Sequence, residues 1–93
     1  MRAKIWLYPG MAGWHFVTLP KKYSAAIQKN HTSLKRGWGS VPVYATIGDT
    51  RWKTSIFPDR KNDTYLLPLK AQVRKREDIY SGDTITFSIE IGR

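Results

Sequence analysis

The stretch VPVYATIGDTRWKTSIF, residues 41–57, decides the fold, because its alternation of apolar and polar residues predicts a β-hairpin. The first arm places three apolar side chains on one face: Val43, Ala45 and Ile47. The second arm places Trp52, Thr54 and Ile56 on one face. We expect Gly48-Asp49-Thr50-Arg51 to form the turn and Pro58-Asp59 to end the second arm.

The segment DTITFSIEI, residues 83–91, predicts a strand with one buried face. The turn residues Ser81-Gly82-Asp83 precede it. If this strand and the hairpin share one core, Ile85, Phe87 and Ile89 must be buried together with Ile47 and Ile56.

Three further apolar runs read as strands: AKIWLY (3–8), WHFVTL (14–19) and TYLLPL (64–69). The first two form a second hairpin across residues 9–13, which contain Pro9 and two glycines. Pro68 has no backbone N–H, so we expect it to confine its end of the third run to a sheet edge or a bulge.

Two segments predict short helices: KKYSAAIQKNH (21–31) and KAQVRKRED (70–78). In the first, Tyr23, Ala26 and Ile27 share one side, and Pro20 suits the first helical position. In the second, we expect Leu69, Val73 and Tyr80 to face inward. Six strands and two short helices in 93 residues predict one mainly β domain over residues 1–93, with the form of a small barrel.

The composition excludes several classes of site. The chain has no cysteine, which excludes disulfides and thiolate chemistry. His15 and His31 lack neighbouring ligands at metal-site spacing, so we expect no metal. No apolar run approaches the roughly 18 residues of a membrane span, and no signal-peptide core is present. We therefore expect a cytoplasmic protein without membrane contact.

The net charge of +9 is unevenly distributed. Residues 1–48 hold seven bases and no acid, whereas residues 49–93 hold nine bases and seven acids. Such a chain attracts polyanions such as nucleic acid at low salt, whether or not that is its role.

Five ordered motifs resemble a known family: WLYPG…GWHFVTLP, GWGSVPVYATIG, RWKTSIFP, YLLPLKAQVRK and SGDTITFSIEI. Over nearly its whole length the chain is similar to a bacterial family of domains of unknown function, found alone or ahead of a bacteriocin-protection (OmpD-associated) segment. The resemblance implies a six-stranded double-split β-barrel with one or two short helices, as in AbrB- and MazE-like DNA-binding proteins. It implies no activity. The chain departs from the expected pattern at Lys21-Lys22, where an acid would begin the helix.

The first candidate site is the start of KAQVRKRED, where Lys70, Arg74 and Lys75 precede the acids. Cations near a helix N-terminus oppose the macrodipole unless an anion offsets them, so this order suggests an anion site. The alternative is structural, with Arg74 bonded to a carboxylate or to carbonyls at a strand end.

The second candidate is Trp38, which lies between two glycines and close to Arg36. It could stack on a planar ligand, or it could cover one end of the barrel. No catalytic constellation is visible, because the acids of the second half lie mostly in turns. We therefore expect neither an enzyme nor a cofactor.

Two functions follow from these residues. The first is a non-catalytic binding module for a small anionic ligand or a protein partner. The second is an AbrB-like nucleic-acid-binding protein that uses its basic surface, and a strictly monomeric state would count against it. The sequence does not name the partner.

Overall fold

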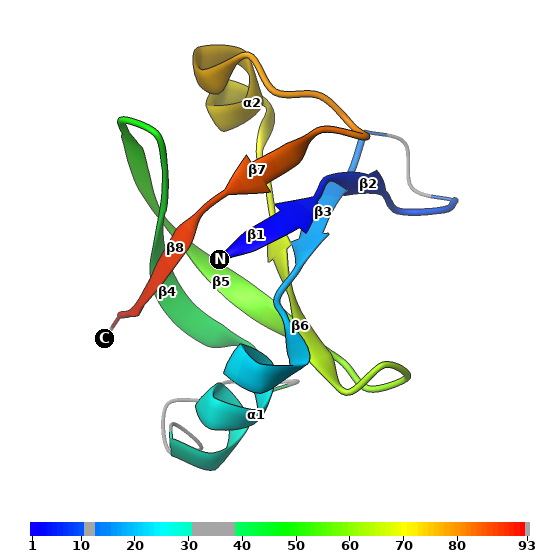
Figure 1. Ribbon diagram of the computed structural model, residues 1–93, viewed down its shortest axis with the longest axis vertical. Coiled ribbons are helices and arrows are strands. Elements are labelled where there is room, and N and C mark those ends of the chain that lie inside the picture. Colours follow the sequence, from blue (N-terminus) through cyan, green and yellow to red (C-terminus); the bar gives the residue numbers. More distant parts are fainter. Residues whose placement is uncertain (11–12, 31–38, 93) are drawn as a thin grey trace.

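The computed structural model describes residues 1–10, 13–30 and 39–92, and it confirms a mainly β architecture (Figure 1). Six strands form one antiparallel sheet in the order β2 (Trp6–Leu7), β3 (His15–Thr18), β6 (Thr64–Pro68), β5 (Thr50–Asp59), β4 (Val41–Ile47), β8 (Ser88–Ile91). A separate pair consists of β1 (Arg2–Lys4) and β7 (Thr84–Thr86). The helices are α1 (Lys21–Asn30) and α2 (Ala71–Glu77), which lie at opposite ends of the molecule.

The predicted hairpin is present, but its turn is shorter than expected. Ile47 pairs with Thr50, so only Gly48 and Asp49 lie outside the ladder, and assigning Thr50 and Arg51 to the turn was wrong. Gly48 has φ +56°, the left-handed conformation that a two-residue hairpin turn requires. The second arm also continues through Pro58 to Asp59, where it pairs with β6.

The first and last predicted strands are each broken in two. The chain passes from β1 to β2 at Ile5 and from β7 to β8 at Phe87, and both side chains are buried. Each break moves the chain from the two-stranded pair into the six-stranded sheet, where β2 and β8 are the two edges. Because these edges do not pair with each other, the six-stranded sheet is not closed into a barrel.

The predicted core is confirmed. Ile47, Ile56, Ile85 and Phe87 are buried in one cluster, and Ile89 packs against it while partly buried. The final strand and the hairpin therefore share one apolar interior, as their alternation requires.

The inward face of α1 differs from the prediction. Ile27 is buried as expected, but Tyr23 and Ala26 are exposed and Ser24 is buried instead. The Ser24 hydroxyl donates to the Leu19 carbonyl and accepts from the Tyr65 amide, so a polar residue satisfies two backbone groups here. Pro20 precedes the helix and its carbonyl accepts from the Ser24 amide, which places it at the N-cap rather than the first helical position.

The helix α2 packs through Leu69, which precedes it, and Val73, and both are buried as predicted. Tyr80 does not face inward: it is 65% exposed, and its hydroxyl donates to Asp78. Within the described ranges, neither helix is long and apolar enough to cross a membrane.

Candidate functional site

The strands β5 and β6 separate along part of their length, and this separation creates the candidate site. They pair only from Phe57–Leu66 to Asp59–Thr64. Continuing that register would place Pro68 opposite Ser55 and Lys70 opposite Lys53. Both positions are outside the ladder, since β6 ends at Pro68 and the chain turns into α2.

Pro68 explains why the ladder stops. The Leu69 amide donates to the His15 carbonyl and the Tyr65 carbonyl accepts from Leu19, so these backbone groups face β3. Backbone groups alternate along a strand, and Pro68 therefore faces β5, where it has no N–H to donate. The strand β6 is internal to the sheet, but its Pro68 end has no partner in the β5 ladder. The expectation that the proline would confine this end to an edge is therefore met locally.

A pocket of about 490 Å³ occupies the gap between the separated strands. We call it the strand-split pocket. Its walls come from β5, from residues 68–71, from Arg74 on α2, and from the residues that begin β3. Its volume lies within the range of about 300–1,000 Å³ that is typical of small-ligand sites.

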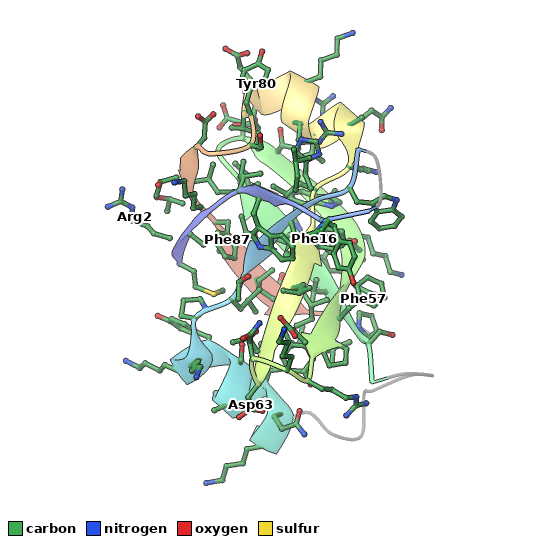
Figure 2. The ribbon with its side chains drawn as sticks, turned by 90° about the vertical axis from the view of Figure 1, so that its right-hand side faces the viewer. Arg2, Phe16, Phe57, Asp63, Tyr80 and Phe87 are labelled. Atoms are coloured by element: carbon green, nitrogen blue, oxygen red, sulfur yellow. The ribbon has the colours of Figure 1, made fainter. Side chains whose placement is uncertain are left out.

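The walls of the strand-split pocket are largely apolar and aromatic. Trp14 and Phe57 line it while remaining 47% and 38% exposed, and Trp52 is the buried aromatic of the wall. Trp14 stacks on Phe16 with ring centroids 5.9 Å apart, which fixes the position of its ring. Figure 2 shows Phe57 at the side of the molecule, between the ends marked by Asp63 and Tyr80.

Arg74 contributes a cation to this wall, and hydrogen bonds hold its guanidinium in place. Its Nε donates to the Leu69 carbonyl at 3.0 Å, and its Nη1 lies 3.4 Å from His15 Nε2. His15 Nδ1 lies 2.8 Å from the Gly13 carbonyl, which can only accept, so in the neutral ring Nδ1 carries the proton and Nε2 accepts from Arg74. The guanidinium is therefore tied to two different strand ends.

The charge of this arginine has no carboxylate at bonding distance in the described structure. Its two partners are a carbonyl and an imidazole, neither of which is an anion, and the lining residues described for the pocket include Lys53 and Lys70 but no acid. Glu90 lies away from this pocket, where it forms an ion pair with Arg51. The strand-split pocket thus combines apolar walls with an excess of positive charge.

The predicted site residues are only partly brought together. Lys70 and Arg74 line the strand-split pocket, but Lys70 is the N-cap residue, outside the first turn where it was expected. Lys75 is exposed and lines a separate recess with Asp78 and Tyr80. Trp38 and Arg36 lie outside the described residues.

Four residues of the pocket were missed by sequence reasoning: Trp14, His15, Lys53 and Phe57. His15 was considered as a metal ligand, and in the described residues no cluster of three potential metal ligands occurs. Trp52 was assigned to the core, and it is indeed buried. The alternation of β5 could have indicated two of these residues, because it places Lys53 and Phe57 on the outward face of the strand.

Comparison with known proteins gives a family but no described activity. The family described as a domain of unknown function (DUF1905) matches residues 2–89. No curated protein matches the chain.

Proposed function

This chain belongs to the DUF1905 family, and from that premise we propose that it is a non-catalytic module that binds a small organic anion in the strand-split pocket. The apolar part of the ligand contacts Trp14 and Phe57, and its anionic group lies beside Arg74 and Lys70. The observation that carries the proposal is the guanidinium of Arg74, which lies in an aromatic pocket and has no carboxylate partner among the described residues.

The physical basis is the cost of a partly buried charge. Arg74 is half-buried, and a cation removed from water is stabilised by an anion more than by neutral acceptors. Its bonds to Leu69 and His15 use two of its five N–H donors, so others remain for a ligand. A charge-assisted hydrogen bond contributes about 1.5–3 kcal/mol, which is enough to discriminate an anion from its neutral analogue.

A titration with 3-phenylpropanoate and the neutral 3-phenylpropanamide tests this proposal by calorimetry. We expect the carboxylate to bind and the amide to bind at least about tenfold more weakly. Arg74→Gln should reduce carboxylate affinity about tenfold or more, whereas Arg76→Gln, the same charge change elsewhere on α2, should alter it less than twofold. Equal affinity of the acid and the amide would contradict the proposal.

Arg74→Gln needs a stability control, because Arg74 also has structural bonds. Loss of the bonds to the Leu69 carbonyl and His15 should lower the free energy of unfolding by about 1 kcal/mol. Arg74→Lys retains the charge but loses the fork geometry, so it should show a similar loss of stability with a smaller loss of carboxylate affinity.

We also propose that the fold is a double-split barrel, that the protein is bacterial and that it is located in the cytoplasm. The passage of the first and last strands between two sheets, at Ile5 and Phe87, supports the double-split form.

Nucleic-acid binding is the second candidate function. It is favoured by the net charge of +9 and by exposed bases on and beside α2, among them Lys70, Lys75 and Arg76. A titration of duplex DNA at about 50 and 200 mM salt tests it. Sequence-selective binding at the higher salt would support it, whereas binding that disappears without sequence preference would mean that the charge is not specific for nucleic acid.

A further inference from the structure

We propose that the ligand of the strand-split pocket is the carboxyl-terminal end of a peptide or protein, an inference that rests on the proposed function. The ligand adds a short strand to the open edge of β5 and places its terminal carboxylate beside Arg74 and Lys70. The backbone of β5 carries this inference.

Among the residues that the structure describes, no strand pairs with the backbone groups on the edge of β5 that faces the pocket. The two-residue turn makes Ile47 and Thr50 the first hydrogen-bonded pair of the hairpin. Bonding alternates along an antiparallel ladder, so the N–H and C=O of Trp52 and Thr54 face β4. Those of Lys53 face the opposite side, where the ladder with β6 does not reach.

An extended peptide satisfies such an edge better than a simple acid does. Its amide N–H can donate to the Lys53 carbonyl and its carbonyl can accept from the Lys53 amide, as in a ladder. A ligand without an amide leaves these two groups to water. Because Lys53 lines the strand-split pocket, the ligand backbone and the ligand carboxylate can be recognised in one place.

The geometry of the pocket selects a chain end rather than an internal segment. The pairing of Phe57 with Leu66 closes one end of the gap between the strands. At the other end the chain turns from Pro68 into α2, which lies beside the hairpin end of β5, where Glu77 accepts from the Thr50 hydroxyl. A pocket of about 490 Å³ bounded in this way accommodates the last residues of a chain.

The charge of the pocket selects the carboxyl end. Arg74, Lys70 and Lys53 attract a carboxylate and repel an amino terminus, and the described lining residues hold no acid that would favour the latter. The exposed rings of Trp14 and Phe57 favour a large apolar last side chain.

A matched set of ligands tests the inference by calorimetry. The tripeptide acetyl-Ala-Ala-Phe is compared with its carboxyl-terminal amide, with an analogue in which an ester replaces the last amide bond, and with 3-phenylpropanoate. We expect the tripeptide to bind at least about tenfold more tightly than 3-phenylpropanoate, since it adds backbone bonds. The ester, which lacks one donor, should lose about fivefold, and the terminal amide should lose most of the affinity.

The outcomes separate this inference from the proposed function. If 3-phenylpropanoate and the tripeptide bind equally, the pocket binds small anions and the peptide inference is overturned. If the tripeptide and its terminal amide bind equally, the carboxylate is not recognised and both are overturned. If no carboxylate in the set binds, both also fail.

A pair of variants tests the backbone contact from the protein side. Lys53→Pro removes the N–H that faces the pocket without removing a bond to β4, and Lys53→Gln removes the same charge while keeping that N–H. We expect Lys53→Pro to bind the tripeptide at least about fivefold more weakly than Lys53→Gln, with both folded by circular dichroism. If Lys53→Pro does not fold, two measurements on the wild-type protein decide instead: the affinity of the ester analogue and the NMR resonance of the Lys53 amide. Equal affinities of the tripeptide and its ester analogue, or no shift of the Lys53 resonance when the tripeptide binds, would overturn the inference.

Discussion

At the residue scale, Gly48 is a position that both the backbone and a neighbouring side chain restrict to glycine. Its φ of +56° is strained for any side chain with a Cβ, and a Cβ there would overlap Glu77 Oε1. Glu77 cannot move without loss, because its other oxygen accepts from the Thr50 hydroxyl at 2.6 Å. This one glycine therefore sets both the turn between β4 and β5 and its contact with α2.

Gly48→Ala should lower the free energy of unfolding by about 1–3 kcal/mol, the range expected for backbone strain at a left-handed position. Urea denaturation measures the change. In a Glu77→Ala background the overlap is gone and only the backbone strain remains, so the additional cost of Gly48→Ala should be smaller. An equal cost in both backgrounds would show that Glu77 does not restrict this site.

Tyr65 gives the molecule a sensitivity to alkaline pH. Burial raises the pKa of its phenol above the usual 10.0, although the charge of Arg60 opposes this, and the hydroxyl donates to Gln28 Oε1. Above pH 10 the unfolded chain therefore loses its tyrosine proton while the folded chain keeps it. Stability then falls as the pH rises, because the unfolded state binds fewer protons.

Tyr65→Phe should reduce this alkaline loss of stability while costing little at neutral pH. The hydroxyl bond to Gln28 is the interaction that is lost there. Denaturation at pH 7 and at several values above 10 measures the difference in slope. Tyr80 contributes in the same direction through its bond to Asp78, so Tyr80→Phe is the comparison for an exposed phenol. Parallel curves for wild type and Tyr65→Phe would contradict the assignment.

At the scale of elements, the separation of β5 and β6 depends on one missing N–H. Pro68→Ala supplies a donor that faces β5, so we expect one more bond in the ladder, opposite Ser55. Hydrogen exchange should show protection of the new amide at position 68. The pocket should narrow, and affinity for 3-phenylpropanoate should fall about threefold or more. An unprotected amide together with unchanged affinity would show that the turn into α2 alone holds the strands apart.

The elements were predictable where their pattern is local. Alternation marks the hairpin and the final strand, apolar runs mark the other three strand segments, and the 3.6-residue spacing places Val73 and Ile27 inward. The breaks at Ile5 and Phe87 could not be predicted, because the apolar run continues through Ile5 and the alternation continues through Phe87, and only the partner strand changes. Tyr80 was misplaced because α2 ends at Glu77, with Asp78 in the left-handed conformation.

The candidate site was predictable only in its cations. Lys70 and Arg74 stand out in sequence because their charges oppose the helix macrodipole. The aromatic and imidazole walls come from the β2–β3 hairpin and from β5, far away in sequence, and no local rule joins them to α2. The bonds from Arg74 to the Leu69 carbonyl and to His15 give it a structural role at two strand ends, and its role toward an anion stays a prediction.

At the scale of the whole molecule, Phe87 is the residue through which both sheets share a core. It is 2% exposed at the break between β7 and β8, and its amide and carbonyl bond to Met1. Phe87→Ala should lower the free energy of unfolding by about 3–5 kcal/mol in urea denaturation. Tyr80→Ala, the removal of a 65% exposed ring, should change it by less than about 0.5 kcal/mol. Similar costs would mean that the two-stranded pair is not coupled to the core.

The pairing of β1 with β7 also determines when the fold can be completed during synthesis. Arg2 lies opposite Thr86, so β1 must wait for β7, which is made much later. Closing such a long loop is entropically costly and slows folding relative to local hairpins. On the ribosome, the hairpin of β4 and β5 can form early, while β1 stays without its partner until β7 emerges. This interval, on the order of ten seconds at roughly 5–20 residues per second, is when this domain is most exposed to aggregation and to chaperones.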